Sequence, residues 1–248
     1  MKHAVLVGAT DGIGLALARE YLGRGWRVAV VGRDADKLER VVAGLRDAFP
    51  ASTVVGVPCD VTDPAAVGPA FEEVLRALGQ MDLMVYCAGV MAPARTAGER
   101  LEGAAAMLEA NALGAVHFLE RGAEYLEPLG RGRLAALGSI AGVRGRGANP
   151  VYCASKAALH AYLEGLRHRL HPSGVGVSAV KPGFVRTRML RPDAPGFPPA
   201  ITAERAAVLI ADGLERGRDD FFVPWWWALV AAALRALPVA LHKRFAPA

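Results

Sequence analysis

The stretch HAVLVGATDGIG, residues 3–14, decides the fold. Residues 3–7 form a short apolar run, which predicts a buried parallel strand. A helical pattern follows the glycines and continues to about Leu22. Glycines at such a turn let the backbone approach a pyrophosphate, and the helix N-terminus then faces the negative charge. The alternative is an ordinary tight turn, but the strand before it and the helix after it favour a phosphate-binding loop. Its glycines are Gly8, Gly12 and Gly14.

The rest of the chain repeats this alternation of strand and helix. Further strands are expected over 26–31, 53–57, 82–86, 133–137, 174–180 and 221–223. Helices are expected over 34–49, 64–78, 99–126 (one helix or two), 150–170 and 203–216, with a loop over 182–199. Alternation of this kind predicts a doubly wound parallel sheet with helices on both faces. We therefore expect one Rossmann-type α/β catalytic domain over 1–224, followed by an apolar tail with a basic end over 225–248.

The composition excludes several other classes of protein. Of the 248 residues 53% are hydrophobic, which provides a sizeable core. The net charge of +5 suits an anionic ligand, but no block of Lys and Arg suggests a nucleic-acid partner. Three scattered cysteines without metal-ligand spacing indicate reduced thiols in the cytoplasm and no metal site. No apolar run is long enough for a membrane-spanning helix, and the N-terminal run is too short for a signal peptide.

Three residues between 137 and 156 could act together on a proton. Ser139 follows the strand over 133–137, and Tyr152 and Lys156 stand four apart at the start of a helix, so both face the same way. A neighbouring ammonium favours the phenolate, so we expect the tyrosine pKa to fall from about 10 toward working pH. The serine hydroxyl could hold a carbonyl or alcohol oxygen beside that phenol. Taken singly, these residues could instead be a half-buried tyrosine, a solvated lysine and a strand-end serine.

The residues after the second strand bear on the choice of dinucleotide. An acidic residue near this point holds the ribose of NAD, whereas an arginine accommodates the 2′-phosphate of NADP. Here Gly32 replaces the acid and Arg33 supplies a cation, which favours NADP. Arg33 could alternatively be a solvated surface residue. Asp11 would oppose an added phosphate nearby, unless it caps the following helix.

These motifs, in this order, resemble the short-chain dehydrogenase/reductase family over nearly the whole chain. The resemblance implies that Asp60 and Val61 contact adenine and that Asn111 supports the active site through a water. It also implies that the Pro-Gly loop over 182–187 lies against the nicotinamide. The implied catalytic residues are Ser139, Tyr152, Lys156 and Asn111. The implied cofactor-binding residues are Gly8, Thr10, Asp11, Gly12, Ile13, Gly14, Arg33, Asp60, Val61, Ala88, Gly89, Tyr152, Lys156, Pro182, Gly183, Val185 and Thr187.

The resemblance also implies a reaction and an assembly. Hydride would pass between NADP(H), or less readily NAD(H), and a carbonyl or alcohol substrate, with Tyr152 moving the proton on oxygen. Lys156 would lower the tyrosine pKa and hold the nicotinamide ribose, and Ser139 would position the substrate oxygen. A homodimer or homotetramer is expected. One departure is Tyr86-Cys87, where the family has two asparagines that brace the central strand.

Several features lie outside these motifs. His117, His160, His168 and His171 lack ligand spacing and are interpreted as surface helix residues. The short segment 189–203 could form a mobile substrate lid. The arginines at its entrance could bind an anionic group of the substrate or could equally be a solvated basic loop; they are Arg186, Arg188 and Arg191. The tail, with three adjacent tryptophans from 225 to 227, suits protein packing, an oligomer contact, a pocket cover or a membrane surface.

Two other functions remain open from the sequence. One is a regulatory NADP-binding protein that has lost turnover, which the intact Ser139, Tyr152 and Lys156 argue against. The other is a reductase of keto-sugars or lipid-linked sugars that serves as half of an epimerase reaction.

Overall fold

The computed structural model of the chain describes residues 2–92, 97–190 and 199–245 and contains a seven-stranded parallel sheet. The strand order is β3-β2-β1-β4-β5-β6-β9, so the direction of winding reverses between β1 and β4. The strands are β1 (His3–Val7), β2 (Arg27–Gly32), β3 (Val54–Pro58), β4 (Leu83–Tyr86), β5 (Arg133–Leu137), β6 (Gly176–Pro182) and β9 (Asp220–Val223). This order confirms the predicted doubly wound α/β fold.

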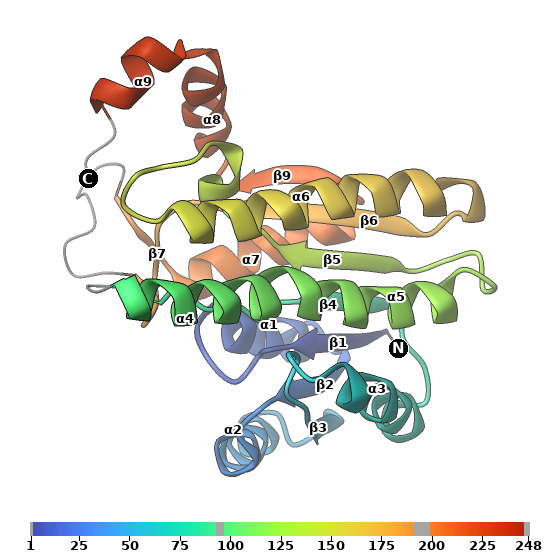
Figure 1. The fold of residues 1–248 in the computed structure, drawn as a ribbon. Helices are drawn as coiled ribbons and strands as arrows, with labels where there is room; N and C mark the ends of the chain where they lie inside the picture. Colours follow the sequence, from blue (N-terminus) through green and yellow to red (C-terminus); the bar gives the residue numbers. More distant parts are fainter. Residues whose placement is uncertain (1, 93–96, 191–198, 246–248) are drawn as a thin grey trace.

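Helices cover both faces of the sheet (Figure 1). One face packs against α1 (Gly12–Gly23), α2 (Ala35–Ala48) and α7 (Ala203–Glu215). The other packs against α3 (Pro64–Leu78), α5 (Gly114–Leu126) and α6 (Pro150–Leu170). Successive strand residues point to opposite faces, so in β1 Leu6 enters the first core and Val7 the second. Strands buried on both faces explain the continuous apolar runs in the sequence.

Side-chain caps fix where three of these helices begin. Asp34 accepts a hydrogen bond from the backbone of Lys37 at the start of α2, and Thr202 caps α7 in the same way. Asp63 caps α3 ahead of Pro64. Such caps satisfy backbone N–H groups that have no partner inside the helix. The predicted helix boundaries are therefore correct to within a residue at these sites.

Two predicted segments differ from the structure. The single or double helix over 99–126 is α4 (Ala97–Leu108) and α5, joined without a break by the π-helical turn η1 (Glu109–Leu113). The predicted loop over 182–199 contains a short strand, β7 (Val185–Arg186), which pairs in parallel with β8 (Ile201–Thr202). The intervening residues 191–198, and with them Arg191, lie outside the described residues.

The tail begins with two helices, α8 (Trp227–Ala236) and α9 (Val239–Phe245), which stand away from the sheet in Figure 1. Trp227 and Ala231 on α8 are buried against Ile140 of η2, a short 3-10 helix over Ile140–Val143. Arg144 donates hydrogen bonds to the carbonyl of Leu234 in the last turn of α8 and to that of Leu237 just after the helix. Thus α8 packs on its own domain. No helix in the described ranges is both long and apolar enough to cross a membrane.

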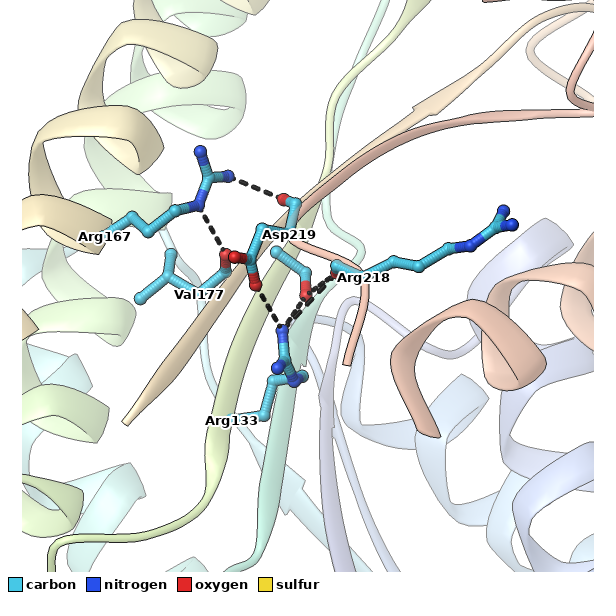
Figure 2. A network of polar contacts seen from close by, with 6 residues as sticks. Arg133, Arg167, Val177, Arg218 and Asp219 are labelled. Carbon is cyan, nitrogen blue, oxygen red and sulfur yellow. Dashed lines mark hydrogen bonds and ion pairs between the residues drawn. The ribbon is translucent and has the colours of Figure 1, made fainter. Parts of the chain in front are cut away.

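A network of polar contacts joins the amino-terminal ends of β5 and β6 to α6 and β9 (Figure 2). Arg133 donates to the hydroxyl of Ser178 at 2.7 Å and pairs with the Asp219 carboxylate at 3.1 Å. Arg167, on α6, donates to the carbonyls of Val177 at 2.9 Å and Asp219 at 2.6 Å. Two arginines therefore tie these elements together at the end of the sheet where the strands begin.

Candidate active site

A cavity of about 560 Å³ opens at the carboxyl ends of β1, β5 and β6, beside the point where the winding of the sheet reverses. Ligands of open α/β sheets bind at this place, and the volume lies within the range of small-molecule sites. Its lining includes the predicted phosphate loop on one side and the three predicted proton-transfer residues, Ser139, Tyr152 and Lys156, on the other. The fold thus joins two motifs that are more than a hundred residues apart in the sequence.

The glycines of the phosphate loop are required by close contacts. Gly8 has φ +78°, and a Cβ on it would lie 2.4 Å from the Cα of Ala88. Gly12 has φ +51° and approaches the Thr187 side chain. The loop therefore meets Ala88 and Thr187, both predicted to bind the cofactor. This open, glycine-lined cradle at the start of α1 fits the diphosphate of a dinucleotide.

Asp11 acts as the N-cap of α1 by accepting a hydrogen bond from Gly12 N at 2.8 Å. Its carboxylate also pairs with Lys37 at 3.0 Å and with Arg188. Burial works to raise the pKa of Asp11, but the hydrogen bonds from Lys37 and Arg188 bring it below its usual value. Two cations therefore offset the negative charge that the sequence placed beside a candidate phosphate site.

Gly32 and Arg33 lie at the carboxyl end of β2. A Cβ on Gly32 would lie 2.5 Å from the methyl group of Thr10, so an acidic side chain at this position would have to displace the Thr10 side chain. The Arg33 side chain is 75% exposed and lies 3.7 Å from the Asp60 carboxylate. Asp60 also accepts two hydrogen bonds from Thr62. Arg33 is thus open to a ligand.

Tyr152 lies at the start of α6 with only 9% of its surface exposed. Burial raises the pKa of its phenol, while the Ser139 hydroxyl beside it and the charge of Arg146 work in the opposite direction. Ser139 itself caps η2 by accepting a hydrogen bond from Ala141 N at 3.1 Å. The cap holds the serine hydroxyl in place next to the phenol. A protonated phenol beside a fixed hydroxyl can donate to a substrate oxygen.

Burial raises the pKa of Tyr152 in the protein alone, which is opposite to the fall expected from the neighbouring Lys156. Its amine donates to the carbonyl of Leu137 at 2.9 Å. A Cβ on Gly89 would lie 3.3 Å from the same amine, so the ammonium faces β4 and β5. Burial lowers the pKa of Lys156 to about 8. The shared helix face was predicted correctly, but the end of a lysine side chain can bend away from its neighbour one turn earlier.

Asn111 is fully buried in the π-helical turn and does not line the cavity. Its amide accepts from Val90 N at 2.7 Å and donates to Val90 O at 2.9 Å and to the Ser155 hydroxyl at 3.0 Å. Ser155 in turn donates to the carbonyl of Tyr152. Asn111 therefore connects the segment after β4 to the helix that carries Tyr152.

Tyr86 provides a brace where the sequence lacks the family's two asparagines. It is fully buried in β4, and its hydroxyl donates to the carbonyl of Ala110 at 2.5 Å. A Cβ on Gly114 would lie 2.6 Å from that hydroxyl, so the helix can approach only because Gly114 has no side chain. The central strand is thus tied directly to the turn that carries Asn111.

His160 is partly buried beside the candidate site and is not a solvated surface residue, contrary to the sequence interpretation. Its ring accepts a hydrogen bond at Nε2 from the backbone N–H of Ser139, at 3.3 Å. A Cβ on Gly138 or Gly142 would lie 2.2 or 2.6 Å from ring atoms. Burial, with the nearby charges of Lys181 and Lys156, lowers the pKa of His160 to about 3. The neutral ring therefore serves as an acceptor that supports the Ser139 turn.

The predicted residues divide into two groups. Those that line the cavity are Gly8, Asp11, Gly12, Ile13, Gly14, Gly89, Ser139, Tyr152, Lys156, Pro182, Gly183, Val185 and Thr187. Those outside it are Thr10, Arg33, Asp60, Val61, Ala88 and Asn111. The sequence interpretation missed a set of mainly apolar lining residues: Met91, Ile140, Arg146, Asn149, Phe184 and Leu190. Each lies within a few residues of a motif, and that proximity was the only available signal.

The fold and the site define a dinucleotide-binding type of α/β protein with a serine, a tyrosine and a lysine in its cleft. Residues 2–196 match the family model described as short chain dehydrogenase, and the chain belongs to that family. An uncharacterized oxidoreductase of Streptomyces coelicolor is 36% identical over 98% of this chain and 95% of its own length.

Solved structures show the same similarity. A short-chain dehydrogenase/reductase from Burkholderia phymatum, in complex with NAD, has a TM-score of 0.85 and 25% identity over 100% of this chain and 96% of its own. A short-chain dehydrogenase from Burkholderia cenocepacia, in complex with NADP, has a TM-score of 0.76 and 29% identity over 86% of this chain and 90% of its own. Helices α8 and α9 lie outside the part of the chain that the family model matches.

Proposed function

We propose that this protein is an NADP(H)-dependent oxidoreductase that interconverts a carbonyl and an alcohol. The observation that carries this proposal is the grouping of Ser139, Tyr152 and Lys156 in one cavity with the glycine loop. The apolar residues of the same cavity, among them Met91, Phe184 and Leu190, support a substrate with an apolar body.

The cofactor would lie across the carboxyl ends of the central strands. Gly8, Gly12 and the α1 N-terminus would hold the diphosphate, and the Pro-Gly loop after β6 would flank the nicotinamide. When bound, the nicotinamide supplies or accepts a hydride. Exposed Arg33 and the absence of an acid at Gly32 support NADP over NAD, although similar structures hold either one.

The chain's own residues would carry the proton chemistry. The Tyr152 phenol, kept protonated by burial, would donate its proton to the substrate oxygen during reduction and recover it during oxidation. The Ser139 hydroxyl, fixed by its capping bond, would hold that oxygen in place. Lys156 would place a positive charge at the base of the cleft, and Asn111 would keep the start of α6 in position.

The proposal is tested by following NADPH oxidation over a panel of ketones, aldehydes and keto-sugars, with NADH in parallel. Tyr152→Phe should lower kcat at least about 100-fold, the range expected for loss of a general acid, with cofactor binding retained. Tyr162→Phe is the matched control, because Tyr162 lies on the same helix but donates to Glu120. Cofactor binding without turnover of any substrate by the wild type would instead indicate a regulatory protein, and equal activity of the two variants would remove Tyr152 from its role.

The choice of dinucleotide is tested separately with Arg33→Ala. Loss of a charge-assisted phosphate contact should raise KM for NADPH about tenfold or more and leave KM for NADH nearly unchanged. Arg40→Ala is the control, since Arg40 is an exposed arginine farther along α2. Equal losses for the two dinucleotides would refute a contact between Arg33 and the 2′-phosphate.

We also propose that the protein works in the cytoplasm as a homodimer or homotetramer. Leu101, Leu108 and Leu113 expose 75%, 41% and 52% of their surface along α4 and η1, which supports a partner there. Leu108→Glu should lower the particle mass measured by light scattering. A monomeric wild type would contradict the assembly.

A further inference from the structure

Helix α8 carries one charged residue, Arg235, and is otherwise apolar. Its inner face, formed by Trp227, Val230 and Ala231, packs against the domain. Its outer face is exposed and apolar as well, at Leu229, Ala232, Ala233 and Ala236. These positions follow a spacing of three and four residues and therefore make one continuous stripe. An exposed apolar stripe of this kind is typical of a surface that packs against a partner or a membrane.

Further exposed apolar residues lie before and after α8 in the chain. Trp225, one turn before Leu229, is 67% exposed. Beyond the helix, Val239 and Leu241 on α9 are 74% and 40% exposed. Figure 1 shows that α8 and α9 project from one end of the molecule. We name the exposed residues Trp225, Leu229, Val239 and Leu241, with the alanines between them on α8, the tail surface.

The charges around the tail surface indicate what covers it. The sequence from residue 221 to the end contains no acidic residue, although the whole chain has 24. Arg235, Lys243 and Arg244 are all exposed in this region. A second copy packed through the same surface would bring these like charges together with no acid to pair them. An anionic lipid surface would instead supply both the apolar medium and the opposite charge.

The geometry further points to a helix that lies on the membrane. With 10 residues, α8 is only about 15 Å long, roughly half the thickness of a bilayer's hydrocarbon core. An exposed tryptophan suits the level of the lipid headgroups. We propose that the tail surface is a peripheral membrane-binding site for anionic lipid, with the apolar stripe of α8 entering the interface and the three cations facing the headgroups. This inference does not depend on the proposed reaction.

The test uses the full chain and vesicles of phosphatidylcholine, with or without phosphatidylglycerol. We expect the protein to sediment with the anionic vesicles and much less with the neutral ones. Leu229→Asp should abolish this binding, and Lys243→Glu should weaken it at least about fivefold, the value expected for one charge at an anionic surface. Leu129→Asp is the matched control, because Leu129 is also an exposed leucine, 47% accessible, but follows the far end of α5.

Several results would overturn the proposal. Failure of the wild type to sediment with anionic vesicles would do so, as would equal binding by Leu229→Asp and Leu129→Asp. A drop in particle mass for Leu229→Asp in the absence of lipid would assign the surface to a second copy instead. Because both leucines are exposed, thermal unfolding should give similar midpoints for the two variants, which excludes misfolding as the cause of lost binding.

Discussion

Replacing Lys156 by Met should change how the stability of the protein depends on pH. Lys156 is 4% exposed, and its ammonium has one hydrogen-bond acceptor, the carbonyl of Leu137. Burial lowers its pKa from 10.5 to about 8. Between these two values the unfolded chain binds a proton that the folded chain does not, so the free energy of unfolding rises with pH in this window. Below pH 8 Lys156 is protonated in both the folded and the unfolded chain, and the folded state bears the full cost of the buried charge.

The size of the effect follows from the shift. Each pKa unit corresponds to about 1.4 kcal/mol, so the free energy of unfolding contributed by Lys156 should fall by about 3 kcal/mol from pH 10.5 to pH 7. Met has a similar length and no charge, and the other titrating groups are common to both proteins. The difference between wild type and Lys156→Met therefore isolates this single group.

The assay is urea unfolding of both proteins at several values between pH 7 and pH 10.5, followed by circular dichroism. The difference in free energy should change by about 3 kcal/mol, with the wild type gaining stability relative to the variant as pH rises. A difference that stays constant across the range would refute the buried, destabilised ammonium. It would mean that Lys156 is hydrated in solution.

Three other residues give predictions of their own. His160→Ala should lower kcat about tenfold in steady-state kinetics, with KM for NADPH unchanged, because the Ser139 N–H loses its acceptor. In the wild type the pKa of His160 is lowered to about 3, so the pH profile of kcat should show no inflection from this ring between pH 5 and 8. Asn111→Leu should lower the free energy of unfolding in urea by about 2–3 kcal/mol, since the partners of its buried amide lose their hydrogen bonds, and an unchanged value would show that water replaces them. Gly183→Ala should lower the midpoint of thermal unfolding by several degrees, because the new Cβ would lie 1.9 Å from Trp227 and overpacking costs about 1–3 kcal/mol. A midpoint equal to that of the wild type would mean that α8 moves aside without cost.

The sequence was sufficient for the parts of the fold that depend on local chemistry. The strand–glycine–helix order at residues 3–14 predicted the sheet, because apolar runs and glycine turns act over short distances. The spacing of Tyr152 and Lys156 predicted a shared helix face for the same reason. Ser139 came from its position at the end of a strand. These three residues do meet in one cavity with the phosphate loop.

Other features depend on distances that the sequence does not contain. The direction of the Lys156 amine is set by the Leu137 carbonyl on another element. The position of His160 depends on the missing side chains of Gly138 and Gly142. One signal was present, since His160 is four residues after Lys156 and so lies on the same side of the helix. A histidine one helical turn after a candidate catalytic lysine should therefore be considered a candidate for the same buried face before it is assigned to the surface.

The arginine network at the beginning of the strands has a consequence for protein engineering. Arg133 and Arg167 fasten β5, β6 and β9 at the end of the sheet opposite the cleft (Figure 2). The loops around the cleft can therefore be randomised to change the range of substrates without altering the hydrogen bonds of these two arginines. Variant libraries that target Met91 and Leu190 should keep most members folded, whereas libraries built at the opposite end should lose many members to instability.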